Sequence, residues 1–354
     1  MLYQTENQHG GDVYGGGITL DFSANTNPLG TPPGVLEAVC RALPRLHRYP
    51  DPYCRRLVQA IAGHEQVPAS YILCGNGAAD LIYTYCAALR PRTAVELAPT
   101  FVEYGAGLAQ VGCRVERYFL HQAQNFDLDE RFLSFLEEKK PEVVFLCNPN
   151  NPTGRLIPLP LLEQILQYCA AQGARLFLDE CFLDLTEDGV SAKSLLAAHP
   201  ELLILKAFTK SYGMAGIRLG YCLCADNALL RRMAAASPPW NVSSPAQSAG
   251  VAALAERDFL QRTLSLVRTE RRWLTDNLTA LGFWVCPSHA NYLLFRGPLG
   301  LREGLLQQGI AIRGCGNYNG LGDGWYRIAV RPHGENEALI TAIRQFCKEK
   351  ALWQ

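Results

Sequence analysis

The sequence lacks the features that mark a secreted or membrane protein. Its 13 cysteines are odd in number, scattered and never in a CxxC pair, which does not suit a disulfide scaffold. No apolar run is long enough to span a membrane, and the N-terminal residues contain no apolar segment of the kind found in signal peptides. We therefore expect a soluble, cytoplasmic protein with reduced thiols, many of them packed in the core.

An excess of charge of one sign is also absent. Lys and Arg together number 33, as do Asp and Glu, so the composition predicts neither nucleic acid nor a membrane surface as a partner. The seven histidines are dispersed, at positions 9, 47, 64, 121, 199, 289 and 333, and no metal site is expected. A small-molecule substrate is the expected partner.

What the sequence does contain is a regular alternation of short apolar runs and longer helical patterns. Strands are expected at 71–75, 93–98, 141–149, 174–180 and 202–208, and helices at 78–90, 101–112 and 159–173. This order is typical of βαβ units. It predicts an α/β fold with a mostly parallel sheet that helices cover on both faces.

The pattern changes after about residue 245. A long helical region (245–281) precedes strand-like segments at 283–297, 310–314 and 325–331 and a closing helix from about 335, which predicts a smaller α+β domain. A chain of 354 residues with 48% hydrophobic composition can bury two cores. The predicted organisation is an N-terminal arm (1–35) associated with the small domain, a large domain (36–244) and the small C-terminal domain (245–354).

Ligands of such sheets bind at the carboxyl ends of the strands, so the turns that follow strands are candidate sites. The segment "CGNGAAD" (74–80) could present backbone N–H groups to a phosphate, although any tight strand-to-helix turn uses glycine and asparagine. The segment "FLCNPNNPTG" (145–154) forms an irregular turn. Ordinary turn chemistry explains its prolines better than its asparagines, one of which could bind a ligand oxygen.

Two further turns carry charge. "LFLDECF" (176–182) ends a strand in acids that could be solvated, bind a metal or pair with a cationic ring nitrogen. "KAFTKSYGMAGIRLGY" (206–221) places Lys210 and Arg218 after a strand, where a lysine is more often a solvated helix residue. Together these turns offer the four groups that bind pyridoxal 5′-phosphate. They are an amine for the Schiff base, an acid for the pyridine nitrogen, an amide for the phenolic oxygen and a turn for the phosphate.

Three of these segments, "NPNNPTG", "LDE" and "TKSYGMAGIRLGY", resemble fold type I pyridoxal-phosphate enzymes of the class I and II aminotransferase superfamily. The resemblance covers nearly the whole chain and implies roles around the cofactor ring. Lys210 is similar to the lysine that forms the Schiff base, and Asp179 to the partner of the ring nitrogen. Asn151 is similar to the donor to the phenolic oxygen, and Phe101 to the aromatic residue that stacks on the ring.

The resemblance also implies how the cofactor phosphate is bound. Gly77, Ala78 and Ala79 are similar to the residues whose backbone forms the phosphate cup, and Arg218 to the arginine that binds the phosphate. Tyr49, in "RYPD", matches a tyrosine that reaches the cofactor phosphate of the neighbouring subunit. The last match implies a homodimer.

Two positions depart from the usual pattern of the superfamily. Phe182 replaces a tyrosine that donates to the phenolic oxygen in many aminotransferases, so Asn151 is the donor left to that oxygen. Ala207 stands where relatives offer a hydroxyl to the phosphate, and Thr209 is the candidate to replace it.

Two branches of the superfamily are candidates, the threonine-phosphate decarboxylases of cobalamin biosynthesis and the histidinol-phosphate aminotransferases. The other segments of the chain resemble the decarboxylases more, among them "LDFSANTNPLG" (20–30) and "IAIRGCGNYNGL" (310–321). By this resemblance Arg327 binds the substrate carboxylate, and Arg313, His9 and Asn25 bind the substrate phosphate. Guanidinium groups suit both anions. On the residues alone, Arg313 could instead point from an edge strand into solvent, and His9 could belong to a polar arm.

The resemblance implies an enzyme that decarboxylates L-threonine O-3-phosphate to (R)-1-amino-2-propanol O-2-phosphate. The alternative is an aminotransferase of the histidinol-phosphate type, and a further alternative is a pyridoxal-phosphate-binding domain without catalytic activity. The sequence does not separate decarboxylation from transamination, which differ by a rotation about one bond, nor phosphothreonine from phosphoserine.

Overall fold

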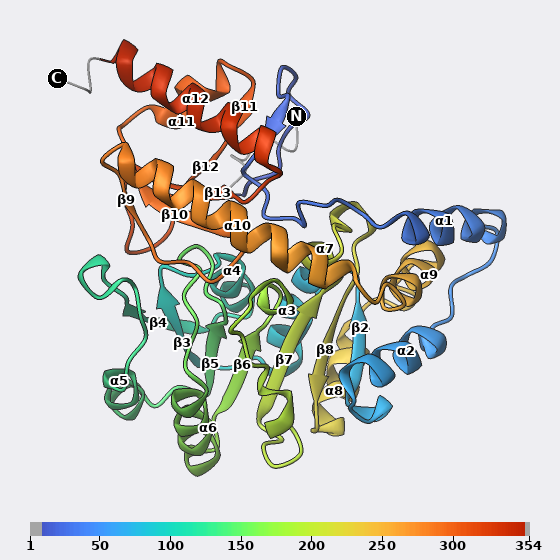
Figure 1. Ribbon diagram of the computed structural model, residues 1–354. Coiled ribbons are helices and arrows are strands. Elements are labelled where there is room, and N and C mark those ends of the chain that lie inside the picture. Colours follow the sequence, from blue (N-terminus) through green and yellow to red (C-terminus); the bar gives the residue numbers. More distant parts are fainter. Residues whose placement is uncertain (1–8, 351–354) are drawn as a thin grey trace.

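The computed structural model describes residues 9–350 and has a seven-stranded sheet at its centre (Figure 1). The spatial order is β2 (Ile72–Gly75), β8 (Gly220–Cys224), β7 (Leu202–Ala207), β6 (Arg175–Asp179), β5 (Val143–Cys147), β3 (Thr93–Ala98) and β4 (Arg114–Phe119). Strand β8 is antiparallel to both of its neighbours, and the remaining neighbouring pairs are parallel. The predicted mostly parallel sheet is confirmed. Residues 1–8 of the expected arm and residues 351–354 lie outside the described residues.

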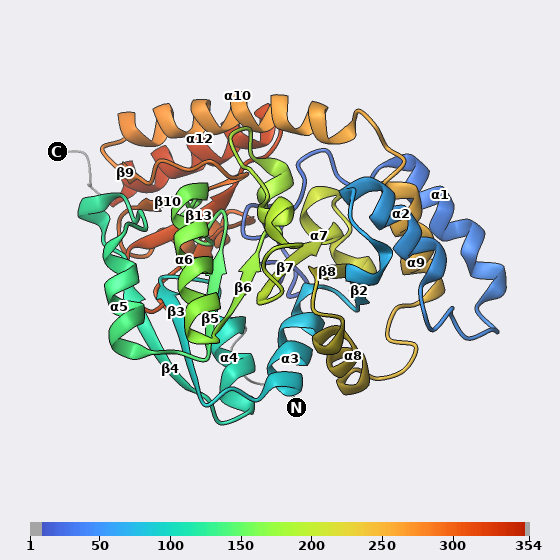
Figure 2. The ribbon, with the colours of Figure 1, turned by 90° about the horizontal axis from the view of Figure 1, so that it is seen from below.

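Alternate side chains of the central strands enter two different cores, one on each face of the sheet. In β5, Val144 and Leu146 belong to the first core, and Val143, Phe145 and Cys147 belong to the second. Helices that contribute to the first core include α2 (Arg55–Glu65), α5 (Arg131–Lys139), α6 (Leu159–Gln172) and α9 (Ser244–Ala253). Those of the second are α3 (Ala78–Leu89), α4 (Glu103–Gln110) and α8 (Asn227–Ala236) (Figure 2). Burial on both faces explains why the central strands β5, β6 and β7 are largely apolar.

The C-terminal part contains a second, antiparallel sheet. Its order is β12 (Arg313–Gly314), β13 (Trp325–Ala329), β10 (Tyr292–Arg296) and β9 (Trp284–Val285). Helices α11 (Leu301–Leu306) and α12 (His333–Glu349) pack a third core with it. The segment 310–314, expected as one strand, divides after Ala311, because its first part, β11 (Ile310–Ala311), pairs with a different strand.

That partner strand is β1 (Leu20–Asp21), which runs parallel to β11. Phe22 continues the connection, because its N–H donates to Ala311 and its carbonyl accepts from Ala329, both at 2.8 Å. These contacts join residues 20–22 to the C-terminal sheet, whereas the division of the chain into domains remains a prediction.

Two helices connect the parts of the fold. Helix α1 (Pro33–Ala42) packs against α9, and α10 (Phe259–Ala280) crosses the molecule (Figure 1). Phe259 at the start of α10 lies in the first core, and Leu274 and Leu278 near its end lie in the third. Across residues 9–350 no helix combines the length and apolarity needed to cross a membrane, and every cysteine except Cys40 and Cys113 is buried.

Candidate active site

A cavity of about 210 Å³ lies at the carboxyl ends of β5, β6 and β7, between the central sheet, residues near the N-terminus and the C-terminal sheet. It is lined by twelve residues that the sequence nominated: His9, Asn25, Ala78, Ala79, Phe101, Asn151, Asp179, Thr209, Lys210, Arg218, Arg313 and Arg327. Residues separated by more than 300 positions therefore meet at one site.

The two lysines of the segment 206–221 have different surroundings. Lys206, within β7, is buried and forms ion pairs with Asp184 at 2.7 Å and Glu65 at 3.4 Å. Burial alone would lower the pKa of Lys206, but these carboxylates raise it well above its ordinary value. Lys210 lies on α7 (Phe208–Ser211) and lines the cavity. Burial, assisted by the charge of Arg327, lowers the pKa of Lys210 to about 8, which makes its amine available as a base or nucleophile near neutral pH.

Asp179 ends β6 at the wall of the cavity and is 5% exposed. One carboxylate oxygen accepts a hydrogen bond from the Tyr104 hydroxyl at 2.6 Å, and the other accepts from the Cys181 backbone N–H at 2.9 Å. Burial raises the pKa of Asp179 above its ordinary value, while the bonds from Cys181 and Tyr104 and the charge of Lys210 oppose that rise. The carboxylate can therefore serve as the counter-charge for a cation in the cavity.

The turn between β2 and α3 forms a cradle for an anion. Gly77 has φ of +84°, and no side chain caps the N-terminus of α3 that begins at Ala78. A Cβ at residue 77 would lie 2.8 Å from the nearest guanidinium nitrogen of Arg218, so glycine is required both by the backbone conformation and by the close approach of the arginine. Free N–H groups of a helix N-terminus beside an arginine suit a phosphate.

The asparagines of "NPNNPTG" divide into structural and cavity-lining residues. Asn148 accepts from the backbone N–H of Ile157, and Asn150 donates to the carbonyl of Pro99. Asn151 lines the cavity, and its side-chain oxygen accepts from Arg327. With that oxygen engaged, Asn151 presents N–H donors to a ligand.

Arg313 and Arg327 face each other across the antiparallel pair β12 and β13, where they are direct register partners. Their exposed fractions are 8% and 6%, and both line the cavity, so Arg313 does not point into solvent. Like charges directly opposite each other in a sheet are unfavourable. Two buried guanidinium groups at one wall therefore indicate a ligand that carries anionic groups.

Asn25 is 1% exposed, and neither its side-chain oxygen nor its nitrogen has a hydrogen-bond partner within residues 9–350. A buried amide without partners is unfavourable, and it indicates a ligand that supplies the missing hydrogen bonds. The resemblance assigns this residue to the substrate phosphate, and its place in the cavity wall agrees with a polar ligand.

Replacing Asn25 by leucine, which has a similar shape, is expected to raise KM at least about tenfold, because hydrogen bonds to a charged group are lost. The same change is expected to stabilise the protein without ligand by about 1 kcal/mol, because an unpaired buried amide is removed. The matched control is Asn27→Leu. Asn27 is equally buried but donates to Ser211 and Thr263, so this variant should be destabilised. Urea unfolding and steady-state kinetics measure both effects, and a destabilised N25L with unchanged KM would contradict the assignment.

His9 lies at the edge of the cavity and contacts α4. Its Nε2 is 2.7 Å from Glu103, whose other oxygen accepts from Tyr83 at 2.6 Å. The imidazole also lies against Phe101, with ring centroids 5.8 Å apart. His9 is therefore part of the cavity wall and can reach a ligand there.

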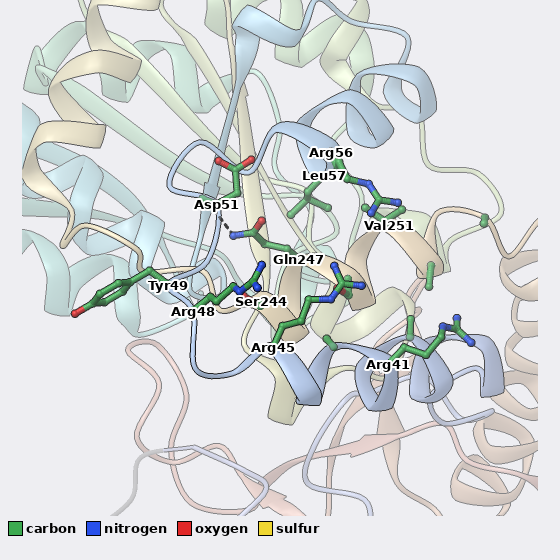
Figure 3. A pocket seen from close by; sticks show the side chains of 15 residues that line it. Arg41, Arg45, Arg48, Tyr49, Asp51, Arg56, Leu57, Ser244, Gln247 and Val251 are labelled. Carbon is green, nitrogen blue, oxygen red and sulfur yellow. Dashed lines mark hydrogen bonds between the residues drawn. The ribbon is translucent and has the colours of Figure 1, made fainter.

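Tyr49 does not reach this cavity within a single chain. Its side chain is 78% exposed and stacks on Trp240 with ring centroids 4.6 Å apart. It borders a second hollow of about 600 Å³ between α1, α2 and α9 (Figure 3). Four arginines line that hollow: Arg41, Arg45, Arg48 and Arg56.

Comparison with known proteins identifies the family. The sequence matches the family Aminotransferase class I and II over residues 18–346. The chain belongs to this family of pyridoxal-5′-phosphate-dependent enzymes. A threonine-phosphate decarboxylase of Salmonella typhimurium is 41% identical over 92% of this chain and 90% of its own, and a histidinol-phosphate aminotransferase of Methanosarcina mazei is 30% identical over 92% and 87%. The crystal structure of the histidinol-phosphate aminotransferase from Clostridium acetobutylicum has a TM-score of 0.87 at 28% identity, covering 93% of this chain and 99% of that one.

The cavity fits the cofactor of the aminotransferase family. Lys210 offers an amine with a lowered pKa, and Asp179 offers a buried acid of the kind expected at the ring nitrogen. The glycine at residue 77 leaves room for Arg218 and a phosphate. Both departures from the common pattern also lie in the cavity wall. Ala207 and Thr209 both line it, and the ring centroid of Phe182 is 5.4 Å from the Lys210 amine.

Two tyrosines at or behind the cavity wall, Tyr318 and Tyr104, were not expected from the sequence. Tyr318 lines the cavity between Arg313 and Arg327, and no spacing rule marks it. Tyr104, by contrast, follows Phe101 by three residues within the helix that the sequence predicts at 101–112. That spacing places both side chains on one face, and it could have nominated Tyr104.

Proposed function

We propose that this chain is a pyridoxal-phosphate-dependent L-threonine O-3-phosphate decarboxylase that forms (R)-1-amino-2-propanol O-2-phosphate for cobalamin biosynthesis. The observation that carries the proposal is the pair Arg313 and Arg327, buried opposite each other at the cavity. L-threonine O-3-phosphate carries two anionic groups, a carboxylate and a phosphate, and two guanidinium groups match them. The 41% identical relative named threonine-phosphate decarboxylase supports the same choice.

In this reaction the bound cofactor supplies an electron sink for the substrate's α-carbon. Arg327 binds and orients the carboxylate, so that the bond to the departing CO2 is the one that breaks. The Lys210 amine delivers a proton to the α-carbon in place of CO2. Asp179 keeps the proton on the ring nitrogen. One proton replaces one CO2, so the reaction needs no second substrate.

The second candidate is an aminotransferase of the histidinol-phosphate type, which the TM-score of 0.87 to such an enzyme favours. Histidinol phosphate has a phosphate but no carboxylate. Arg327 would then bind a carboxylate only when the second substrate of the transamination, the amino acid or keto acid, is in the site. The buried arginine pair favours a substrate that carries both anions at once.

The proposed enzyme is a homodimer. Tyr49 is exposed beside Trp240 and borders the second hollow with its four arginines, which Figure 3 shows. In the dimer it is expected to reach the cofactor phosphate of the partner subunit. A tyrosine that is 78% exposed and stacked on an exposed tryptophan is what such an interface would cover.

The deciding experiment incubates the pyridoxal-phosphate-loaded protein with L-threonine O-3-phosphate and no keto acid, and follows the products by mass spectrometry. The proposal predicts that the amine phosphate accumulates over many turnovers with one CO2 for each. Accumulation of product only when histidinol phosphate and 2-oxoglutarate are supplied would establish the aminotransferase instead. L-serine O-3-phosphate is a matched substrate that tests the contribution of the single methyl group.

A further inference from the structure

Tyr104 is fully buried beneath the cavity and contacts two of the residues assigned to the cofactor ring. Its hydroxyl donates to one oxygen of Asp179 at 2.6 Å, while the Cys181 N–H donates to the other at 2.9 Å. Its ring meets Phe101 edge to face, with centroids 5.6 Å apart and planes at 80°. One side chain thus contacts both the acid expected at the ring nitrogen and the aromatic residue expected to stack on the ring.

The hydrogen bond from Tyr104 has two physical consequences. With one donor on each oxygen, the Asp179 carboxylate is prevented from rotating, so the direction of its remaining lone pairs is fixed. A hydroxyl that donates to a buried carboxylate also favours the ionised form. That matters here because burial disfavours the charge.

A second tyrosine shows that packing alone does not require this hydroxyl. Tyr85 is also fully buried in the same core, and both tyrosines contact the rings of Phe145 and Phe177. The Tyr85 hydroxyl has no hydrogen-bond partner within the described part of the chain. The two phenols therefore share an environment and differ in whether the hydroxyl touches Asp179.

We propose that Tyr104 is a positioning residue that keeps the Asp179 carboxylate ionised and oriented toward the ring nitrogen of the cofactor. The proposal rests on the placement of the cofactor ring in the proposed function but not on the choice of substrate. It can therefore be tested by binding, without turnover.

The experiment measures binding of pyridoxamine 5′-phosphate to the cofactor-free protein, because this ligand has the cofactor ring but forms no covalent bond with Lys210. A second ligand has carbon in place of the ring nitrogen. In Tyr104→Phe the Kd for pyridoxamine 5′-phosphate is expected to rise on the order of tenfold, since a hydrogen bond to a charged group is lost. The Kd for the carbon analogue is expected to stay unchanged. The control Tyr85→Phe removes a buried hydroxyl from the same core and should change neither Kd.

Three results would overturn the proposal: unchanged binding of both ligands in Y104F, equal weakening of both ligands, or equal effects of Y104F and Y85F. A second test compares Asp179→Asn with the double variant Asp179→Asn and Tyr104→Phe, in which no buried carboxylate is left without its donor even if Y104F alone does not fold. Without a carboxylate, loss of the hydroxyl should have no further effect on the Kd for pyridoxamine 5′-phosphate. A further tenfold loss would show that Tyr104 acts independently of Asp179. Because no substrate is used, failure here is distinct from failure of the decarboxylase proposal.

Discussion

Replacing Lys210 by alanine is expected to reduce turnover by at least about 10³-fold, within the range that a positioned proton donor contributes. Lys210 is the one lysine among the described residues that line the cavity, so no second amine can take over its part. The fold should be unaffected. The pKa of Lys210 is lowered to about 8, below its value in the unfolded chain, so the folded state disfavours the charged amine, and its removal is expected to leave stability unchanged or slightly higher.

Two further variants separate chemistry from charge. Lys210→Arg keeps a cation in the cavity but provides no amine, and it should lose as much activity as K210A. Lys139→Ala, which removes a surface lysine paired with Glu138, should retain full activity. The absorbance of the bound cofactor should also shift in both Lys210 variants, because the covalent bond to the lysine is absent. Activity of K210A within tenfold of the unchanged protein would exclude Lys210 from the reaction.

Hydrophobic periodicity predicted those elements of the fold that are buried on both faces. Strands β5 and β7 are continuously buried, and their apolar runs stand out in the sequence. Strand β4 was not predicted, because it lies at the edge of the sheet and its partly exposed sequence RVERYF is neither continuously apolar nor regularly alternating. Strand β8 was not predicted because its sequence GYCLC follows directly on the Arg218 turn and opens with glycine, a residue that is depleted in strands.

The sequence predicted which strand ends meet at the site, but it did not predict the register in which the strands of the C-terminal sheet pair. A parallel sheet brings the ends of its strands to one edge, so Asp179, Asn151 and Lys210 were expected to meet, and the structure places all three around one cavity. The direct pairing of Arg313 with Arg327 depends on the register of two short strands. That register is set by the loop between β12 and β13, for which the sequence has no periodic signal.

The sequence also did not show which lysine of the segment 206–221 is structural. The two lysines are four residues apart. Lys206 is buried and forms ion pairs with two acids, Glu65 and Asp184, whereas Lys210 lines the cavity. Those acids come from distant segments: Glu65 ends α2, and Asp184 lies in a short 3-10 helix at Leu183–Leu185. A contact of that kind is determined by tertiary structure and has no local pattern.

Replacing Lys206 by methionine is expected to lower the free energy of unfolding by about 3 kcal/mol or more, because removal of one partner leaves buried charges uncompensated. Glu65 would retain Lys193 at 2.8 Å and the Tyr221 hydroxyl, and Asp184 would retain the Ser211 hydroxyl at 3.0 Å. Because these partners remain, the expected decrease in the free energy of unfolding is near the lower end of the range measured when one partner of a buried ion pair is removed. Urea unfolding of the protein at pH 7 measures it.

The variant also has an expected pH dependence. Burial raises the pKa of Glu65, but Lys206, Lys193 and Tyr221 together lower it to about 2. A carboxylate whose pKa is lower in the folded than in the unfolded state contributes stability above about pH 4.5, and this stability is lost as the pH falls toward 2. In K206M that acid-sensitive contribution should be smaller. The gap in unfolding free energy between the two proteins should therefore narrow on acidification from pH 5.

The double variant Lys206→Met and Glu65→Gln tests whether charge is the cause. A neutral amide at residue 65 needs no cation, so the double variant should be more stable than K206M alone, and the two changes should be strongly non-additive. Simple additivity would mean that Lys206 acts through packing of its methylene groups.

The ion pairs of Lys206 with Glu65 and Asp184 also connect to the active site. Asp184 accepts a hydrogen bond from the hydroxyl of Ser211, the residue that follows Lys210 on α7. K206M should therefore lose activity as well as stability, and K206M/E65Q should recover stability more fully than activity, since Asp184 still lacks its cation.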